Sequence, residues 1–229
     1  MCFHDNLTKR ITIAIDGPAA AGKSTLARRI AAKLGFVYVD TGAMYRAVAL
    51  WALRTSVAPS DMHRLEQLAN AAHIEFGPED AVLLNDEDVT AAIRTAQVSQ
   101  AASEVSMIPA VRRAMVERQR EIGRQTSVVM EGRDIGTVVF PEATVKIFLD
   151  ALPEERAMRR ANESDQPAGV VEEQLRERDQ RDRGRPESPL MQAPDAVYVD
   201  TTGLSIEEVE AAVLKIIRER TSNGRERTQ

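Results

Sequence analysis

The sequence contains a single cysteine, Cys2, among its 229 residues. One thiol can form neither a disulfide nor a multi-thiolate metal site within the chain. Cysteine usage of this kind is typical of a protein that works in a reducing compartment, and we therefore expect the chain to be cytoplasmic.

Long apolar runs and an excess of basic charge are also missing. Residues 1–10 lack the apolar core of a secretory signal, and no stretch reaches the ~20 apolar residues that a membrane span requires. The formal net charge is −5 at pH 7, whereas nucleic acids and anionic lipids select basic faces. We expect a soluble protein with neither a nucleic-acid nor a membrane partner, and we expect it to be a monomer.

What the sequence does contain is an alternation of short β-rich runs with longer helical patterns. The β-rich runs cover residues 11–15, 36–40, 127–130, 145–149 and 196–200. Such an alternation indicates a parallel sheet with helices on its faces. A chain of 229 residues that is 43% apolar is long enough for one such core. We predict the α/β class, with a five-stranded parallel sheet flanked by helices.

Two segments interrupt this alternation. Residues 41–126 carry helical patterns, broken at Pro109, around a stretch at 74–89 where short apolar runs alternate with turn residues. That stretch favours a small antiparallel meander. Residues 154–185 form the second segment, which is helical and highly charged. We predict one domain, residues 1–229, whose core comprises residues 11–40, 127–153 and 186–220.

A glycine-bounded loop joins the first predicted strand to the first predicted helix. It consists of Gly17, Pro18, Ala19, Ala20, Ala21, Gly22, Lys23, Ser24 and Thr25. In this context G-x-x-x-x-G-K-[ST] predicts a cradle of backbone N–H groups around the phosphates of ATP. Lys23 would reach the β- and γ-phosphates, and the Ser24 hydroxyl could bind Mg²⁺. The alternative is a glycine-capped turn that merely precedes a helix.

Arginine is the second functional signal, since the N-K-x-D motif that reads guanine is absent and a GTPase is disfavoured. The arginines that could converge at the carboxyl ends of the strands are Arg46, Arg112, Arg133, Arg156, Arg159, Arg160, Arg178, Arg181 and Arg185. Guanidinium groups stay charged and bind phosphate through two parallel hydrogen bonds. A second phosphorylated substrate would need them, although some could form i,i+4 pairs on an exposed helix.

The helical pattern at residues 170–184 favours a ligand over a solvated surface. Arg178, Arg181, Asp182 and Arg185 are spaced to lie on one helix face. One carboxylate cannot neutralise three guanidinium groups. Such a face is typical of a site that receives an anion.

Several motifs of the chain resemble those of the bacterial cytidylate kinase family. They lie at residues 15–25, 40–46, 93–95, 132–141, 146–150 and 178–185. The string Gly-Arg-Asp-Ile-Gly-Thr-Val-Val-Phe-Pro at 132–141 is far more specific than the phosphate loop. The resemblance covers about residues 11–217. It implies γ-phosphoryl transfer from ATP to CMP or dCMP, a monophosphate-binding insert at about 41–126 and a short helical lid at about 154–185.

The resemblance also implies which side chains bind CMP. Thr41, Arg46 and Arg133 would hold its phosphate, Ser103, Arg112 and Asp134 would read its base, and Arg178, Asp182 and Arg185 would hold its ribose and phosphate. Cytosine has acceptors at O2 and N3 and a donor at N4, which Arg112 and Asp134 would complement. Uracil would set its O4 against the Asp134 carboxylate, so the site could reject it.

The implied mechanism needs no general base, because a CMP phosphate oxygen is already ionised. The catalytic groups would be Lys23, Arg133 and two arginines of the lid, Arg156 and Arg159. Mg²⁺ would bind Ser24, with Glu131 in its outer coordination shell. Two positions depart from the family pattern, since Glu131 stands where relatives often have Asp and Ser24 where some have Gly.

Two other functions are compatible with a phosphate loop. One is a small-molecule kinase for UMP, shikimate or dephospho-coenzyme A, which the set Ser103, Arg112 and Asp134 argues against. The other is a nucleotide-binding regulator without turnover, which the intact Lys23 and Arg133 argue against.

Overall fold

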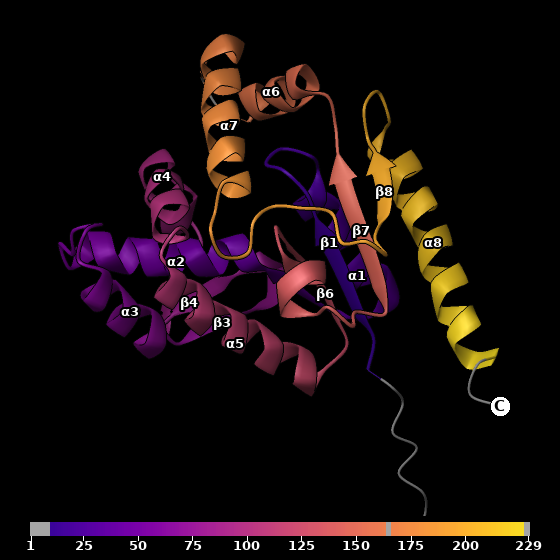
Figure 1. The fold of residues 1–229 in the computed structure, drawn as a ribbon, viewed down its shortest axis with the longest axis horizontal. Coiled ribbons are helices and arrows are strands. Elements are labelled where there is room, and N and C mark those ends of the chain that lie inside the picture. Colours follow the sequence, from indigo (N-terminus) through magenta and orange to yellow (C-terminus); the bar gives the residue numbers. More distant parts are fainter. Residues whose placement is uncertain (1–9, 164–165, 227–229) are drawn as a thin grey trace, which may run out of the picture.

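A computed structural model describes residues 10–163 and 166–226 of the chain. Its centre is a five-stranded parallel sheet in the order β2-β6-β1-β7-β8 (Figure 1), which confirms the predicted class. The strands are β1 (Thr12–Asp16), β2 (Val37–Asp40), β6 (Val128–Gly132), β7 (Val145–Asp150) and β8 (Val197–Asp200). The phosphate loop therefore starts from the middle strand.

The central strands of the sheet are buried on both faces, and their sequences explain why. In β1, Ile13 and Ile15 belong to one core cluster, whereas Ala14 belongs to another. In β6, Val129 and Met130 divide between the same two clusters. Since successive side chains point to opposite faces, a strand that is buried on both faces is a continuous apolar run.

Helices α1 (Lys23–Leu34) and α8 (Ile206–Glu226) pack together on one face of the sheet. A capping box opens α8, because the Ser205 N–H donates to Glu208 Oε2 at 2.8 Å and the Glu208 N–H donates to Ser205 Oγ at 3.3 Å. No helix of the described ranges is both long and apolar enough to cross a membrane, and this includes α8 with its 21 residues.

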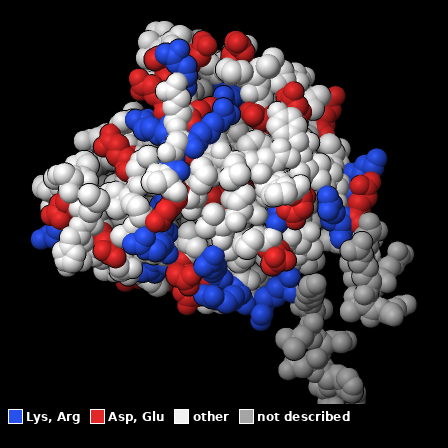
Figure 2. All heavy atoms as spheres, in the orientation of Figure 1, with Lys and Arg blue, Asp and Glu red and all other residues white. Residues whose placement is uncertain are grey.

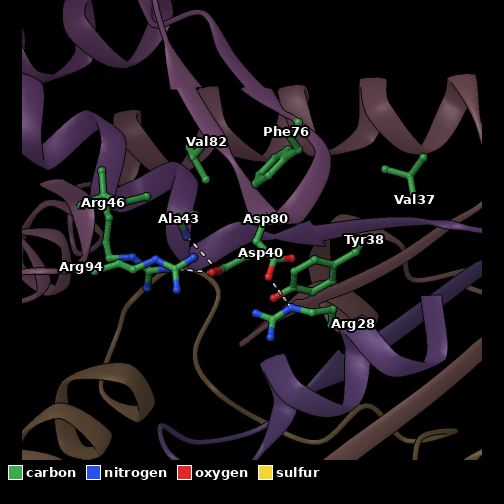
Figure 3. A pocket seen from close by; sticks show the side chains of 12 residues that line it. Arg28, Val37, Tyr38, Asp40, Ala43, Arg46, Phe76, Asp80, Val82 and Arg94 are labelled. Atoms are coloured by element: carbon green, nitrogen blue, oxygen red, sulfur yellow. Dashed lines mark hydrogen bonds and ion pairs between the residues drawn. The ribbon is translucent and has the colours of Figure 1, made fainter. Parts of the chain in front are cut away.

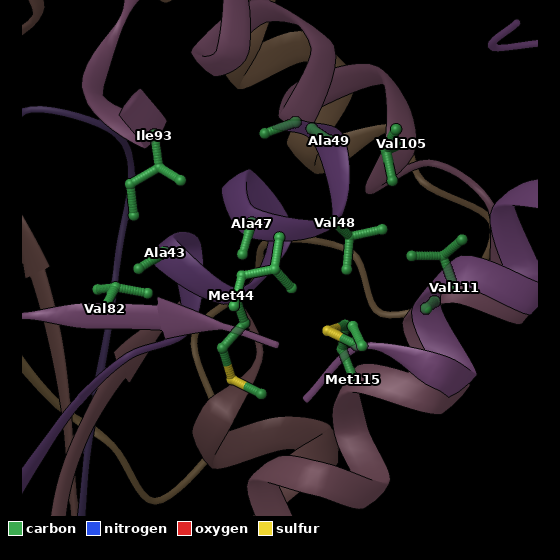
Figure 4. Close-up of a cluster of buried hydrophobic side chains, with 14 of the residues drawn as sticks. Ala43, Met44, Ala47, Val48, Ala49, Val82, Ile93, Val105, Val111 and Met115 are labelled. Atoms are coloured by element: carbon green, nitrogen blue, oxygen red, sulfur yellow. The ribbon is translucent and has the colours of Figure 1, made fainter. Parts of the chain in front are cut away.

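The segment from residue 41 to residue 125, called the insert below, packs on the other face of the sheet. Its elements are α2 (Thr41–Arg54), α3 (Met62–Ala71), β3 (Ile74–Phe76), η1 (Pro78–Asp80), β4 (Val82–Leu84), β5 (Glu87–Asp88), η2 (Ala92–Arg94), α4 (Ala96–Val105) and α5 (Pro109–Gln125). Strands β3, β4 and β5 form the predicted antiparallel meander. Figure 4 shows how Met44 and Val48 of α2 pack with Met115 of α5.

The predicted break at Pro109 is confirmed. Pro109 is the first residue of α5, where its missing N–H is not needed by the helix. The helical pattern from residue 91 comprises η2, α4 and α5, and Pro109 opens the last of them.

Helices α6 (Pro153–Asn162) and α7 (Ala168–Arg183) lie beyond the carboxyl ends of the strands (Figure 1). The expectation for Arg185 was wrong in one respect: α7 ends at Arg183, where the Gly184 N–H donates to Gln180 O at 2.8 Å, so Arg185 follows the helix instead of lying on its face. The polar link expected before α7 lies partly outside the described residues, at 164–165.

Candidate active site

The phosphate loop runs from the end of β1 to the first turn of α1. Gly17 has a φ of 146°, and a Cβ there would lie 1.9 Å from the backbone oxygen of Leu149, so a larger residue does not fit. Gly22 precedes α1 with a φ of 86° and offers no side-chain cap. The first N–H groups of α1 therefore lack a capping side chain and can bind an anion.

Lys23 is buried at the start of α1, where its Nζ donates to Pro18 O at 2.5 Å. Burial, helped by the positive charges of Arg133 and Arg178 and opposed by Glu131, lowers the pKa of Lys23 to about 7. A bound phosphate would relieve this repulsion and favour the charged lysine.

Arg178 of α7 faces the same crevice. Burial and then the charge of Arg133 lower its pKa to about 10, with Arg46 acting in the same direction. Its Nε has no hydrogen-bond partner among the described residues. Figure 2 shows Lys and Arg side chains gathered beside α7, between it and the helices of the insert. Cations from four segments of the chain, Lys23, Arg46, Arg133 and Arg178, thus lie close enough for their charges to interact.

The three residues predicted to read the base come close together. Arg112 of α5 donates through Nη2 to Asp134 Oδ2 at 2.5 Å, and both side chains are buried. Ser103 of α4 is buried nearby, with an Oγ that lacks a partner in the described part of the chain. Ser106 connects them, since its hydroxyl donates to Ser103 O at 2.8 Å and its carbonyl accepts from Arg112 Nη1 at 3.3 Å. A buried hydroxyl without a partner is costly unless a ligand supplies one.

Asp182 of α7 is shared by two arginines. Its Oδ2 accepts from Arg133 Nε at 2.8 Å, and its Oδ1 accepts from Arg185. Burial by itself would raise the pKa of Asp182, but the charges of Arg133, Arg185 and Arg178 outweigh burial and lower it. Arg181 is half-buried on the same helix, and its Nε has no partner within the described ranges.

Thr41 and Arg46 lie at the start of α2. The Thr41 hydroxyl donates to Glu131 O at 2.7 Å. Asp40 caps the helix and also accepts from Arg46 Nη2 at 2.6 Å, as Figure 3 shows. Arg46 and Arg94 of η2 both line a cavity of about 310 Å³ between the core and the insert. No role was predicted for Arg94, although it belongs to one of the family motifs.

The Glu131 carboxylate lies beside the phosphate loop, close to the hydroxyl groups of Ser24 and Tyr38. It accepts hydrogen bonds from the Ser24 hydroxyl and from Tyr38 Oη, the latter at 2.8 Å. Burial and then the charge of Asp40 raise the pKa of Glu131. Oxygen donors of this kind fit Mg²⁺, which usually binds one or two protein ligands together with substrate phosphates. Within the described residues no group of three or more acidic, histidine or cysteine side chains forms a metal site alone.

Arg156 and Arg159 of α6 lie against the phosphate loop but make different contacts. Arg156 is buried, and its Nη1 donates to Ala19 O at 3.2 Å and to Asp179 Oδ2 at 2.7 Å. Arg159 is more exposed and donates to Thr201 Oγ1 at 2.9 Å. Arg156 therefore ties α6 and α7 to the loop.

A second cavity, of about 180 Å³, lies beside the loop. Its lining includes Gly22 and Thr25 of the loop, Arg159 of α6, and the apolar side chains of Leu204 and Ile206. The sequence did not predict this cavity, because its walls come from three segments that are far apart along the chain.

Asp16 was not predicted as part of the site. Its two carboxylate oxygens accept from the N–H groups of Ile135 and Gly136, at 2.8 and 2.7 Å. It thereby fixes the loop that carries Arg133 and Asp134 to the end of β1. The sequence did contain a signal for Asp16, since it is an acidic residue at the carboxyl end of a buried strand.

The chain is similar to known proteins over nearly its whole length. The sequence profile of the cytidylate kinase family matches residues 13–219. A cytidylate kinase of Solibacter usitatus (strain Ellin6076) is 62% identical over 229 residues, which cover 97% of this chain and 98% of that relative. A cytidylate kinase of Carboxydothermus hydrogenoformans is 52% identical over 213 residues, which cover 90% of this chain and 96% of that relative.

A solved structure resembles the fold without close sequence similarity. An uncharacterized protein from Eubacterium ventriosum matches with a TM-score of 0.55 and 10% identity, over 91% of this chain and 99% of that chain. At this identity the likeness concerns the fold alone.

Proposed function

The chain belongs to the cytidylate kinase family, and from that premise we propose which of its residues carry out the reaction. It is a transferase that phosphorylates CMP to CDP with ATP as the donor. An inactive regulator and a kinase for shikimate or dephospho-coenzyme A are thereby disfavoured. One observation supports the assignments most strongly: burial, and after it the charge of Arg133, lowers the pKa values of both Lys23 and Arg178, so these three cations lie close together.

The ATP side of the crevice comprises residues 17–25 and the adjoining 180 Å³ cavity. The loop N–H groups and Lys23 would bind the phosphates. The apolar cavity beside Gly22 suits the adenosine end of the nucleotide. Ser24 would hold Mg²⁺, with Glu131 in its outer shell, and the ion would neutralise part of the phosphate charge.

The CMP side is formed by the insert, the loop after β6 and α7. We assign the phosphate to Thr41, Arg46 and Arg133, the base to Ser103, Arg112 and Asp134, and the ribose and phosphate to Arg178, Asp182 and Arg185. The unpartnered Oγ of Ser103 supports this assignment, since a bound base would satisfy it. Asp182 can accept from a ribose hydroxyl, and we propose that dCMP, which keeps the 3′-hydroxyl, is also a substrate.

The chemical step is an in-line displacement. A phosphate oxygen of CMP forms a bond to the γ-phosphorus of ATP, the bond between that phosphorus and the β,γ-bridging oxygen breaks, and ADP leaves. No base is needed, because the attacking oxygen is already ionised. Lys23 and Arg133 lower the barrier by holding the two anions together and by stabilising the charge that shifts to the leaving oxygen.

The lid arginines complete the site. We propose that Arg159 and Arg156 of α6 approach the transferred phosphoryl group when both nucleotides are bound. Contact of Arg156 with Ala19 O supports this, because it already places a guanidinium at the loop. Closure of such a lid would also exclude water from the reacting phosphate.

The remaining proposals concern organisation and location. We propose a core of residues 11–40, 127–153 and 186–220, an insert at about 41–126 and a lid at about 154–185. We also propose a cytoplasmic monomer, on the basis of the single cysteine and the acidic net charge.

The base-reading role is tested by measuring ADP release with CMP, dCMP and UMP. Asp134→Ala should lower kcat/KM for CMP by on the order of 10²-fold or more and affect UMP far less, because only cytosine donates from N4. Glu121→Ala, which removes an exposed carboxylate from α5, serves as the control. Equal losses with CMP and UMP would reject the role of Asp134.

A further inference from the structure

A continuous series of polar contacts links the residues assigned to the base with those assigned to the ribose and phosphate. Its members, in order of contact, are Asp134, Arg112, Ser106, Arg185, Asp182 and Arg133. Ser106 is the neutral member at its middle. On one side its carbonyl accepts from Arg112 Nη1 at 3.3 Å, and on the other its hydroxyl accepts from Arg185 Nη2 at 3.0 Å.

The hydroxyl of Ser106 is restricted to one role toward Arg185. It donates its only proton to Ser103 O at 2.8 Å, so it can only accept from a guanidinium, which is a donor without acceptors. Ser106 is only 5% exposed, and Arg185 only 8%. Water therefore cannot easily replace the hydroxyl, and its loss would leave a buried N–H of Arg185 without this acceptor.

The same hydrogen bond joins two distant parts of the chain. Ser106 follows α4 of the insert, whereas Arg185 follows α7, 79 residues further along. The other recorded partner of Arg185 is Asp182, on α7 itself. Within the described residues, Ser106 is thus the hydrogen-bond partner through which the insert contacts the Arg185 side chain.

We propose that Ser106 is a positioning residue for CMP, which holds Arg185 at the correct distance from Arg112. One nucleotide must reach both arginines at once, because its base and its ribose phosphate are covalently joined. A hydroxyl that binds Arg185 next to a carbonyl that binds Arg112 sets this spacing. The inference rests on the proposed function, since it takes the roles of both arginines from there.

Ser106→Ala tests this inference by steady-state kinetics. It removes the acceptor for Arg185 but keeps the carbonyl that binds Arg112. We expect KM for CMP to rise about tenfold, as for the loss of a hydrogen bond to a charged group, with kcat and KM for ATP within about twofold of the wild-type values. A residue with a merely structural role would instead change KM for ATP and the melting temperature together with KM for CMP.

A double-mutant cycle shows whether Ser106 acts through Arg185. In the Arg185→Ala background, Ser106→Ala should raise KM for CMP less than about twofold further, because its partner is already missing. Ser99→Ala is the matched control: it lies on α4, and its hydroxyl makes no recorded hydrogen bond in the described part of the chain. An undiminished effect of Ser106→Ala in the Arg185→Ala background would overturn the inference.

Ser106→Thr covers the case in which Ser106→Ala does not fold, because threonine keeps the hydroxyl. We expect its KM for CMP within about threefold of the wild-type value, and a tenfold rise at an unchanged melting temperature contradicts the inference. Asp134→Ala, assayed in parallel, distinguishes a failure of the positioning role of Ser106 from a failure of the proposed base site. The positioning role alone fails if Asp134→Ala lowers kcat/KM for CMP selectively while Ser106→Ala matches the wild type. The assignment of the base site fails if Asp134→Ala lowers kcat/KM for CMP and for UMP equally.

Discussion

The two proposed sides of the crevice differ in how they would bind their nucleotides. The ATP side would use backbone N–H groups within one short segment, residues 17–25, which needs glycine at position 17 where the chain passes Leu149. The CMP side would use side chains from α2, α4, α5, the loop after β6 and α7, which must first be brought together by folding. The proposed donor site is thus a local structure, whereas the proposed acceptor site is a property of the whole fold.

The largest effect on kcat should come from Lys23, the charged side chain of the phosphate loop. Lys23→Met should lower kcat by on the order of 10³-fold, as the removal of a charge that stabilises the transition state of phosphoryl transfer does. KM for CMP should change only a few-fold, as measured by initial rates at saturating ATP. Lys33→Met on the exposed side of α1 should keep the wild-type rate. A large rise in KM for CMP would show that the two sides are not separate in this way.

On the proposed CMP side, Arg112→Ala should lower kcat/KM for CMP by about 10²-fold. It would remove the donor to the base, and it would leave the buried carboxylate of Asp134 without its partner. KM for ATP should stay the same, since Arg112 lies in the insert. The neighbouring Arg113→Ala removes an exposed guanidinium from the same helix and should have little effect. A comparable rise in both KM values would contradict the division between donor and acceptor sides.

The two arginines of α6 should differ in how much they stabilise the fold. Arg156→Ala should reduce the free energy of unfolding by about 3 kcal/mol, because Asp179 would remain buried without its partner. Arg159→Ala should change stability by less than about 1 kcal/mol, since Arg159 is partly exposed. Urea unfolding measures both. Equal destabilisation by the two substitutions would show that Arg159 is as much a structural residue as Arg156.

A smaller effect should appear in the pH dependence of stability. The pKa of Lys23 is lowered from 10.5 to about 7 in the folded chain, chiefly by burial. Between these values the unfolded chain binds the proton and the folded chain does not, so this lysine makes the folded state gain stability as the pH rises from about 7. Unfolding of the nucleotide-free protein at pH 7 and 9 should show this gain, and Lys23→Met should show less of it. An identical pH dependence in both proteins would contradict the burial of a cation.

Much of the fold could be predicted because its signals are local. Continuous apolar runs mark strands that are buried on both faces, as Ile13 to Ile15 show, and Pro109 marks the start of α5. The predicted end of α7 was one residue too late, because Gly184 caps the helix. Arg185 was therefore wrongly placed on the helix face. Helix boundaries depend on such capping bonds, which a periodic pattern does not contain.

The site residues could be predicted less completely. Arginines and the Gly-Arg-Asp string are distinctive, so their segments were found. Asp16, Tyr38 and Ser106 were not, because each acts through a partner 79 or more residues away. Nothing in the sequence around Ser106 indicates that Arg185 lies beside it. Contacts of this kind exist only after the insert and α7 have packed against the same core.

We propose that the two nucleotides bind side by side, with their phosphates meeting between Lys23 and Arg133. The most direct test is inhibition by a compound in which adenosine and cytidine are joined through five phosphates. It should compete with ATP and with CMP, and it should bind far more tightly than either nucleotide, because one molecule fills both sites. Competition with only one of the two substrates would contradict the claim.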